Sequence, residues 1–299
     1  MYTVIDKGLV KEYLPKRRRE SHKGTYGRAA IVAGSMEYTG AAYLATAACL
    51  RSGAGYTTLF VPAKILPYYI LKAPEALLVS VCEGERYSFD SSKMRMLCDY
   101  DSVAFGMGMG VTEAVCRGAE WLLKHYEGKL ILDADGLNSL AEYRKVELQD
   151  LFSHKKCDVL ITPHVKEFSR LTGIKTEEIV AEPLHVANDW AKAYQTSVLL
   201  KNYETVITDG ERSFLNCSGN SGQAKGGSGD VLSGLIAGLC ASGANTLKAG
   251  LCGAYLAGLA AELAVKEIGE YSLTASDVIS YLGRAFLFVT EDTDEERGE

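Results

Sequence analysis

The chain has 299 residues, of which 47% are hydrophobic and 23% are charged, and its formal net charge at pH 7 is -6. This composition is that of a globular protein large enough to bury a sizeable core. The negative charge argues against nucleic acid as a partner, and no apolar run reaches the roughly 18 residues that a membrane span requires. The eight cysteines lack CxxC pairing, so we expect free thiols in the cytoplasm.

Short apolar segments alternate with helical patterns along the chain. Residues 1–27 are polar and basic and predict a loop-like lead-in, of which about 1–20 precede the domain, and an acidic tail from about 290 to 299 is expected to be disordered. The expected strands are Arg28 to Ser35, Tyr56 to Val61, Leu77 to Val81, Ser102 to Phe105, Lys129 to Leu132, Asp158 to Ile161, Ser197 to Lys201, and a hairpin of Thr205 to Thr208 and Ser213 to Leu215. The expected helices are Thr39 to Ser52, Thr112 to His125, a helix from His164 through Leu171, Pro183 to about Tyr194, Val231 to Ala241, Leu247 to Lys266, and Ala275 to about Phe288.

This alternation predicts one α/β domain over residues 1–299, with a central, mostly parallel sheet flanked by helices. Ligands of such folds bind at the carboxyl ends of the strands. Polar clusters follow the expected strands at Gly34-Ser35, Gly106 to Gly110, Asp133 to Asn138, Thr162 to Glu167, Lys201 to Thr205, and Gly226 to Asp230. We therefore expect an active site at one edge of the sheet.

The most informative stretch is the glycine-rich segment from Gly219 to Asp230, which runs into an apolar helix. Glycines and the free N–H groups of a helix start suit a phosphate. A carboxylate beside a bound anion is costly, so Asp230 makes sense as the acceptor of a proton from a group that attacks the phosphate. The simpler alternative is a helix N-cap with a flexible lead-in.

Common nucleotide and hydrolase motifs do not explain this stretch. The P-loop pattern is absent, Gly106 to Gly110 fails the GxGxxG spacing, and Asp230 stands where GxSxG requires glycine. The cluster at Gly106 to Gly110 could be a tight strand-to-helix turn and no more.

Gly227-Ser228-Gly229-Asp230 resembles the GxGD signature of ribokinase-like small-molecule kinases. The wider stretch from Ser218 through Gly234 is similar to that of the ADP-dependent NAD(P)H-hydrate dehydratases, and matching motifs extend over roughly residues 10 to 285. Ser228 replaces a frequent threonine but keeps the hydroxyl, and Gln223 stands where many relatives have methionine. The other matching segments are His22 to Arg28, Gly40-Ala41-Ala42, Arg51 to Gly55, Leu132 to Asn138, and Thr162 to Glu167.

The resemblance implies roles for single residues. Asp230 would hold the substrate and act as the base, and Glu167 would help to organise Mg²⁺ through water. Without the resemblance, His164 is more simply a surface or helix-capping histidine, Glu167 a first-turn carboxylate, and Asp133 and Asp135 turn residues. The implied substrate contacts are Ala41, Gly108, His164 and Asp230, and the implied nucleotide contacts are Lys201, Asn202, Tyr203, Glu204, Thr205, Gly226, Gly227, Ser228 and Gly229.

The implied function is nicotinamide-nucleotide repair: the ADP-dependent dehydration of the S form of hydrated NADH or NADPH, with release of AMP and phosphate. The chain leaves no room for an epimerase domain, so a separate NAD(P)H-hydrate epimerase is expected. We expect a homo-oligomer, since alanine-rich helices such as Leu247 to Ala264 could pack subunits as well as a core. Two alternatives remain open, a vitamin-precursor kinase of the same fold and a non-catalytic nucleotide-binding regulator.

Overall fold

The computed structural model describes residues 2–291, and its helices and strands follow the order expected from the sequence. The acidic tail predicted from about residue 290 lies outside the described residues, except for Thr290 and Glu291. The strands are β1 (Thr3–Val4), β2 (Arg28–Val32), β3 (Tyr56–Pro62), β4 (Leu77–Cys82), β5 (Ser102–Phe105), β6 (Lys129–Leu132), β7 (Asp158–Ile161), β8 (Ser197–Leu200), β9 (Thr205–Thr208) and β10 (Ser213–Asn216). The α-helices are α1 (Lys7–Tyr13), α2 (Thr39–Leu50), α3 (Ser91–Arg95), α4 (Glu113–His125), α5 (Ala134–Tyr143), α6 (Leu148–Ser153), α7 (Val165–Thr172), α8 (Thr176–Ala181), α9 (Pro183–Tyr194), α10 (Ser228–Ala241), α11 (Thr246–Ile268) and α12 (Ala275–Thr290).

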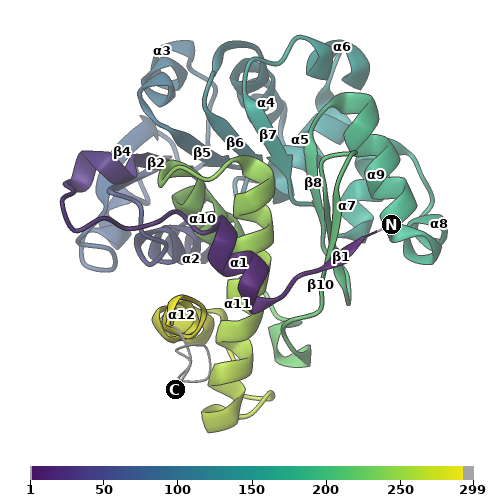
Figure 1. The fold of residues 1–299 in the computed structure, drawn as a ribbon. Helices are drawn as coiled ribbons and strands as arrows, with labels where there is room; N and C mark the ends of the chain where they lie inside the picture. Colours follow the sequence, from purple (N-terminus) through teal and green to yellow (C-terminus); the bar gives the residue numbers. More distant parts are fainter. Residues whose placement is uncertain (1, 292–299) are drawn as a thin grey trace, which may run out of the picture.

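The described strands form one sheet in the order β1-β10-β9-β8-β7-β6-β5-β2-β3-β4 (Figure 1). Neighbouring strands run parallel except around β9, which is antiparallel to β8 and β10. The prediction of a central, mostly parallel sheet flanked by helices is therefore confirmed. The chain leaves β2 for β3 and β4 on one side, then crosses to β5 and builds the sheet in the other direction. This reversal between β2 and β5 is a topological switch point, where α/β folds form a crevice at the carboxyl ends of the strands.

Both faces of the central strands β2, β5, β6, β7 and β8 are buried, which explains why these strands are mostly apolar. In β2, Ala29 and Ile31 face the cluster that includes α2, α10, α11 and α12, whereas Ala30 and Val32 face the cluster that includes α4, α5, α7 and α9. Figure 1 shows α10 and α11 crossing one face of the sheet, with α12 beside them. The small residues of α2 and α10 let these two helices pack closely against each other.

The N-terminal segment is more ordered than the predicted lead-in. β1 pairs parallel with β10, and the backbone N–H of Ile5 donates to the carbonyl of Leu215 at 3.0 Å. Helix α1 then buries Val10 completely against the core. Charged residues dominate the composition of this segment, so its short apolar face was not evident from the sequence. That face becomes ordered because it packs on a sheet edge and a core supplied by the rest of the chain.

Helix α11 is long and apolar enough to cross a membrane by length and composition alone. Its most apolar 18-residue window is 72% buried inside the fold, as in a core helix. The same burial removes the argument that this alanine-rich helix packs subunits.

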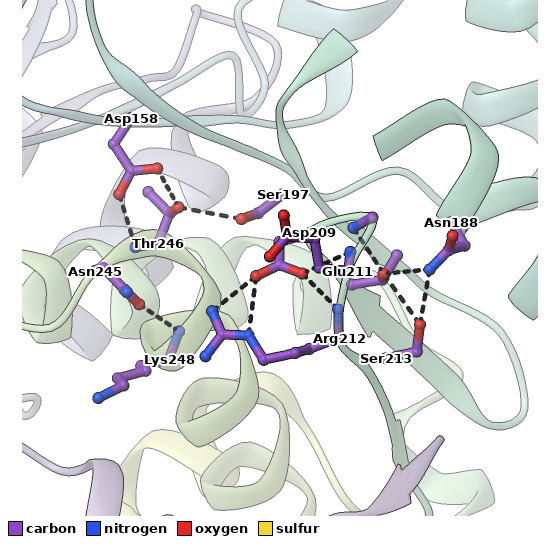
Figure 2. A network of polar contacts seen from close by, with 12 residues as sticks. Asp158, Asn188, Ser197, Asp209, Glu211, Arg212, Ser213, Asn245, Thr246 and Lys248 are labelled. Carbon is purple, nitrogen blue, oxygen red and sulfur yellow. Dashed lines mark hydrogen bonds and ion pairs between the residues drawn. The ribbon is translucent and has the colours of Figure 1, made fainter. Parts of the chain in front are cut away.

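The far end of the sheet, opposite the carboxyl ends of the parallel strands, is closed by polar contacts (Figure 2). The predicted β9–β10 hairpin is present, but its loop has four residues because the register pairs Thr208 with Ser213. Asp209 holds that loop, because its carboxylate accepts from the backbone N–H of Arg212 at 2.8 Å and pairs with the guanidinium of Arg212 at 2.7 Å. Nearby, the Thr246 hydroxyl donates to Asp158 Oδ1 at 2.6 Å, which fixes the start of α11 against β7.

Candidate active site

Side chains from three neighbouring strand ends meet at the carboxyl edge of the sheet. Asp133 follows β6, His164 follows β7, and Lys201 follows β8. Lys201 Nζ lies 2.8 Å from Asp133 Oδ1, and the backbones of His164 and Lys201 pair in an isolated β-bridge. The predicted gathering of polar clusters at one sheet edge is thus present for these three.

Asp230 enters this cluster from α10. The helix begins at Ser228, three residues earlier than predicted, so Asp230 lies in its first turn. Burial is the main cause that raises the pKa of Asp230 to about 7, with Asp133 and Asp135 adding to it and Lys201 opposing it. A carboxyl group with a pKa near neutrality is suited to take a proton at physiological pH.

The glycines before Asp230 differ in whether the fold would accept a side chain at their positions. Gly227 has φ 98°, a left-handed conformation that strains any other residue, and a Cβ there would lie 2.6 Å from Leu44 Cδ1 and 3.0 Å from the Cβ of Ala275, so the fold itself accounts for glycine. At Gly226 a Cβ would meet no atom within 4 Å, and at Gly229 the nearest atom would be Lys201 Nζ at 3.4 Å. Neither position needs glycine for the fold, which points to a ligand approaching the backbone closely.

His164 and Glu167 form a capping box at the start of α7, so both simpler readings of these residues are confirmed. His164 Nδ1 accepts from the backbone N–H of Glu167 at 3.2 Å, and Glu167 Oε2 accepts from the backbone N–H of His164 at 2.9 Å. Burial, followed by Lys201 and Arg170, lowers the pKa of His164. A neutral imidazole whose Nδ1 accepts carries its proton on Nε2, which lies 3.4 Å from Glu167 Oε1, and because the side chain is 47% exposed a ligand can reach it as well.

Ala41 and Gly108 lie on the other side of Asp230, at the switch point between β2 and β5. Gly108 has φ 62°, and a Cβ there would lie 2.7 Å from the Cβ of Ala41 and 2.8 Å from that of Tyr38. The backbone N–H of Gly110 donates to Asp135 Oδ2 at 2.7 Å, which ties the glycine cluster after β5 to the start of α5. The cluster from Gly106 to Gly110 is therefore a tight strand-to-helix turn that packs closely against Ala41 and Tyr38.

A cavity of about 560 Å³ lies beside the glycine loop. Five consecutive residues predicted to bind nucleotide, Lys201 to Thr205, line it together with Ser228 and Gly229, whereas Gly226 and Gly227 are not among its lining residues. Asp230 itself is not among the lining residues of this cavity, although Gly229 next to it is. A larger cavity of about 680 Å³ lies between α1, α2 and α12, but no residue of the glycine loop lines it, so volume alone does not identify the site.

The wall formed by residues 216–223 was not predicted from the sequence. Its loop is fixed to α11, because the Ser218 hydroxyl donates to the carbonyl of Tyr255 at 3.1 Å and the backbone N–H of Gly219 donates to Glu262 at 2.7 Å. Asn220 Nδ2 is buried without a hydrogen-bond partner among the described residues. A buried amide left unpaired in a cavity wall is a donor that a ligand can use.

The sequence also missed the partners of Asp133. Asp133 is 1% exposed, and besides Lys201 it accepts a hydrogen bond from the Ser233 hydroxyl at 2.7 Å. The spacing of Asp230 and Ser233 places both on one face of a helix, but the sequence gives no indication that Asp133 meets that face.

The described residues contain no group of three or more His, Cys, Asp or Glu side chains placed to hold a metal ion. Glu167 nevertheless fits a water-mediated role, because it is buried close to Lys201 and Asp133. Mg²⁺ commonly keeps several waters and is bound by one or two carboxylates together with phosphates. The residues present therefore suit magnesium that arrives with a nucleotide, rather than a preformed ion site.

Comparison with known proteins identifies relatives over almost the whole chain. A family model described as NAD(P)H-hydrate dehydratase matches residues 29–284. The bifunctional NAD(P)H-hydrate repair enzyme Nnr of Thermofilum pendens is 36% identical over 93% of this chain and 53% of its own length. The chain thus spans about half the length of this relative and of a similarly named one from Moorella thermoacetica.

Other relatives match along their full length. The ADP-dependent (S)-NAD(P)H-hydrate dehydratase of Bacillus subtilis is 33% identical over 93% of this chain and 95% of that protein. The crystal structure of the ADP/ATP-dependent NAD(P)H-hydrate dehydratase from Bacillus subtilis, co-crystallised with ATP and Mg²⁺, superimposes with a TM-score of 0.82 at 31% identity, covering 96% of this chain and 99% of that one.

Proposed function

The chain belongs to the NAD(P)H-hydrate dehydratase family, and from this membership we propose that it repairs nicotinamide nucleotides. Its reaction is the ADP-dependent dehydration of the S form of hydrated NADH or NADPH, which yields NADH or NADPH, AMP and phosphate. The single observation that carries the proposal is Asp230, a buried carboxyl group with its pKa raised to about 7, set between the glycine loop and the switch-point crevice.

In the first step, Asp230 takes the proton of the C6 hydroxyl group of the hydrated ring. The hydroxyl oxygen forms a bond to the β-phosphorus of ADP, and the bond from that phosphorus to the bridging oxygen breaks, so that AMP leaves. The backbone N–H groups at Gly226 to Gly229 stabilise the charge that develops on the phosphoryl oxygens. The open space at Gly226 supports this role, because a phosphate can approach the backbone there.

In the second step, the lone pair of the ring nitrogen expels phosphate from C6, and loss of a C5 proton restores the dihydronicotinamide. Ala41, Gly108 and His164 are the proposed contacts of the hydrated nucleotide. The exposed imidazole of His164 supports this assignment, because its Nε2–H can donate to the substrate.

Lys201, Asn202, Tyr203, Glu204 and Thr205 are the proposed adenine-nucleotide contacts, together with Gly226, Gly227, Ser228 and Gly229. Their position around the cavity of about 560 Å³ supports this part of the proposal. Magnesium bound with the nucleotide would supply positive charge to the phosphates, and Glu167 would hold it through water.

The decisive assay incubates the purified protein with hydrated NADH and hydrated NADPH, comparing ADP with ATP as the second substrate. We expect the absorbance of reduced nicotinamide to return in step with AMP formation from ADP. A vitamin-precursor kinase would instead accumulate a stable phosphorylated alcohol, and a non-catalytic regulator would bind nucleotide without turnover. Either of these results would reject the proposal.

We place the protein in the cytoplasm, where an epimerase activity supplies the S form. The eight free cysteines support a reducing compartment. We also propose a homo-oligomer. The strongly exposed Tyr68, Ile70 and Leu71 would provide apolar surface for it, and light scattering on the purified protein tests this.

A further inference from the structure

We propose that Lys201 contacts the transferring phosphoryl group through its ammonium group, and that Asp133 and Ser233 are the residues that position it. This assignment rests on the proposed function for the identity of the reaction. It goes beyond the adenine-nucleotide contact expected of Lys201, and it adds two residues to which the sequence assigned no role in the reaction.

The geometry of Lys201 carries the first part of the inference. Its ammonium group lies 2.8 Å from Asp133 Oδ1, and only 3.4 Å from where a Cβ on Gly229 would stand. The side chain is 22% exposed, and Lys201 lines the nucleotide cavity together with Gly229. The cation therefore lies against the backbone of the glycine loop, beside the position of a phosphate bound to its N–H groups.

The charges around the loop explain why a cation is needed there. Asp133, Asp135 and Asp230 all approach the start of α10, and of the charged groups that act on Asp230 in the described structure, Lys201 is the one cation. Burial alone would lower the pKa of Lys201, but Asp133, Glu167 and Asp230 together raise it, so the amine stays protonated. The carboxylates repel a bound phosphate. Without the charge of Lys201, only the N–H groups of the loop would offset this repulsion.

Asp133 and Ser233 fix the ammonium group in place. Asp133 is buried, with Lys201 on one carboxylate oxygen and the Ser233 hydroxyl on the other at 2.7 Å. Ser233 is completely buried on α10, one turn after Asp230, so the helix that carries the base also carries the support of the lysine. A buried carboxylate held on both oxygens cannot turn, and neither can the lysine bound to it.

The test measures affinity for ADP and for AMP separately, because only ADP carries the phosphoryl group that Lys201 is inferred to touch. In the Lys201→Met variant we expect ADP binding to weaken about tenfold or more and AMP binding to change less than about twofold. Turnover should fall about a hundredfold, as when a preorganised donor to a transition state is removed. Lys201→Arg, which keeps the charge, should retain part of the preference for ADP.

A pH profile gives an independent readout. Lys201 holds down the pKa of Asp230, against the opposing fields of Asp133 and Asp135 from the start of α5. Glu167 and His164, at the start of α7, interact electrostatically with the same lysine. The Lys201→Met variant should therefore shift the acidic limb of its residual activity to higher pH.

Ser233 has a matched control at the opposite end of the sheet. There the Thr246 hydroxyl donates to Asp158, as the Ser233 hydroxyl donates to Asp133, and Thr246 is likewise buried (Figure 2). We expect Ser233→Ala and Thr246→Ala to lower the Tm by similar amounts, while only Ser233→Ala lowers kcat, about tenfold, with a smaller loss of ADP preference.

An unchanged ratio of ADP to AMP affinity in Lys201→Met would overturn the inference and leave the dehydratase proposal standing. Equal kcat in Ser233→Ala and Thr246→Ala would remove the positioning role. If the wild-type protein failed to dehydrate the hydrates, the proposed function would fall, but the ratio of ADP to AMP affinity would still decide the role of Lys201.

Discussion

Replacing Asp230 by Asn separates proton transfer from binding, because the amide keeps the size of the side chain but cannot accept the proton. We expect turnover of the hydrated nucleotide to fall at least about a hundredfold, the usual scale for loss of a general base. ADP affinity, measured by calorimetry, should stay within about threefold of wild type. Near-normal turnover in this variant would refute the role assigned to Asp230.

The raised pKa of Asp230 predicts opposite effects of pH on activity and on stability. Activity needs the ionised carboxylate, so it should rise with pH through about 7. The folded protein binds this proton more tightly than the unfolded chain does, because its pKa is raised from 3.8 to about 7. This contribution to stability is therefore present at low pH and is lost as pH rises across that window.

Asp230→Asn removes this titration from the folded state. We expect the variant to have a higher Tm than wild type at pH 8 and a clearly smaller Tm advantage at pH 5, where the folded carboxyl group is protonated and only the ionisation of the unfolded chain above 3.8 still separates the two proteins. Thermal unfolding at the two pH values measures the difference. A constant Tm difference across this range would show that Asp230 ionises as an ordinary exposed carboxylate.

Single residues were predictable where their chemistry conflicts with their surroundings. Asp230 could be identified because a carboxylate is anomalous beside glycines that suit an anion. Ser233 could not, because a serine in an apolar helix is unremarkable until the chain brings Asp133 to it from a strand that lies 100 positions earlier in the sequence. His164 and Glu167 lie where they were expected, but the contacts they make are those of a helix cap.

In the loop and helix proposed to hold the phosphate, alanine substitutions of the glycines should divide into two classes, those that weaken ADP binding and those that lower stability. Gly226→Ala should leave the Tm unchanged, since its Cβ meets nothing within 4 Å, yet it should weaken ADP binding about tenfold or more by blocking the approach of the phosphate. Gly227→Ala should lower the stability by roughly 1–3 kcal/mol, because it forces a Cβ into left-handed backbone and against Leu44.

Gly283→Ala is the matched control for these loop variants. Gly283 lies inside α12, where a Cβ also meets nothing within 4 Å, so alanine should stabilise that helix by about 0.5–1 kcal/mol and leave ADP binding unchanged. Thermal unfolding and calorimetry on the three variants check the division. Equal ADP affinity in Gly226→Ala and Gly283→Ala would show that the loop backbone does not approach the ligand.

For the molecule as a whole, nucleotide binding should be visible as added stability. The cavity beside the glycine loop is already formed, with a wall fixed to α11, so a ligand that binds the native state alone raises the unfolding free energy. ADP at a hundred times its Kd should add about 2.7 kcal/mol. Differential scanning fluorimetry with ADP, AMP and phosphate measures this. A Tm unaffected by millimolar ADP would argue against a nucleotide site in this cavity.

Most of the architecture followed from periodicity and turn signals, because a parallel sheet buried on both faces produces short apolar strands between helices. The failures have local physical causes. The start of α10 was placed too late, since Ser228, Gly229 and Asp230 are weak helix formers that are helical here beyond the left-handed Gly227. Helix α5 was missed because it begins directly after β6, with Ala134 at φ 48°. The cavity wall at residues 216–223 depends on contacts to α11 that no local pattern encodes.

The first strand of the sheet has a practical consequence for anyone who adds an affinity tag. β1 pairs with β10, and β10 ends at Asn216, which lines the nucleotide cavity. Deleting residues 2–5, or displacing them with a bulky fusion partner, would remove β1 from the sheet. The backbone groups along the edge of β10 would then be unpaired and available to pair with other molecules. Because Ile5 is only 5% exposed, a preparation tagged ahead of β1 that aggregates or loses ADP affinity should be suspected of a lost edge strand.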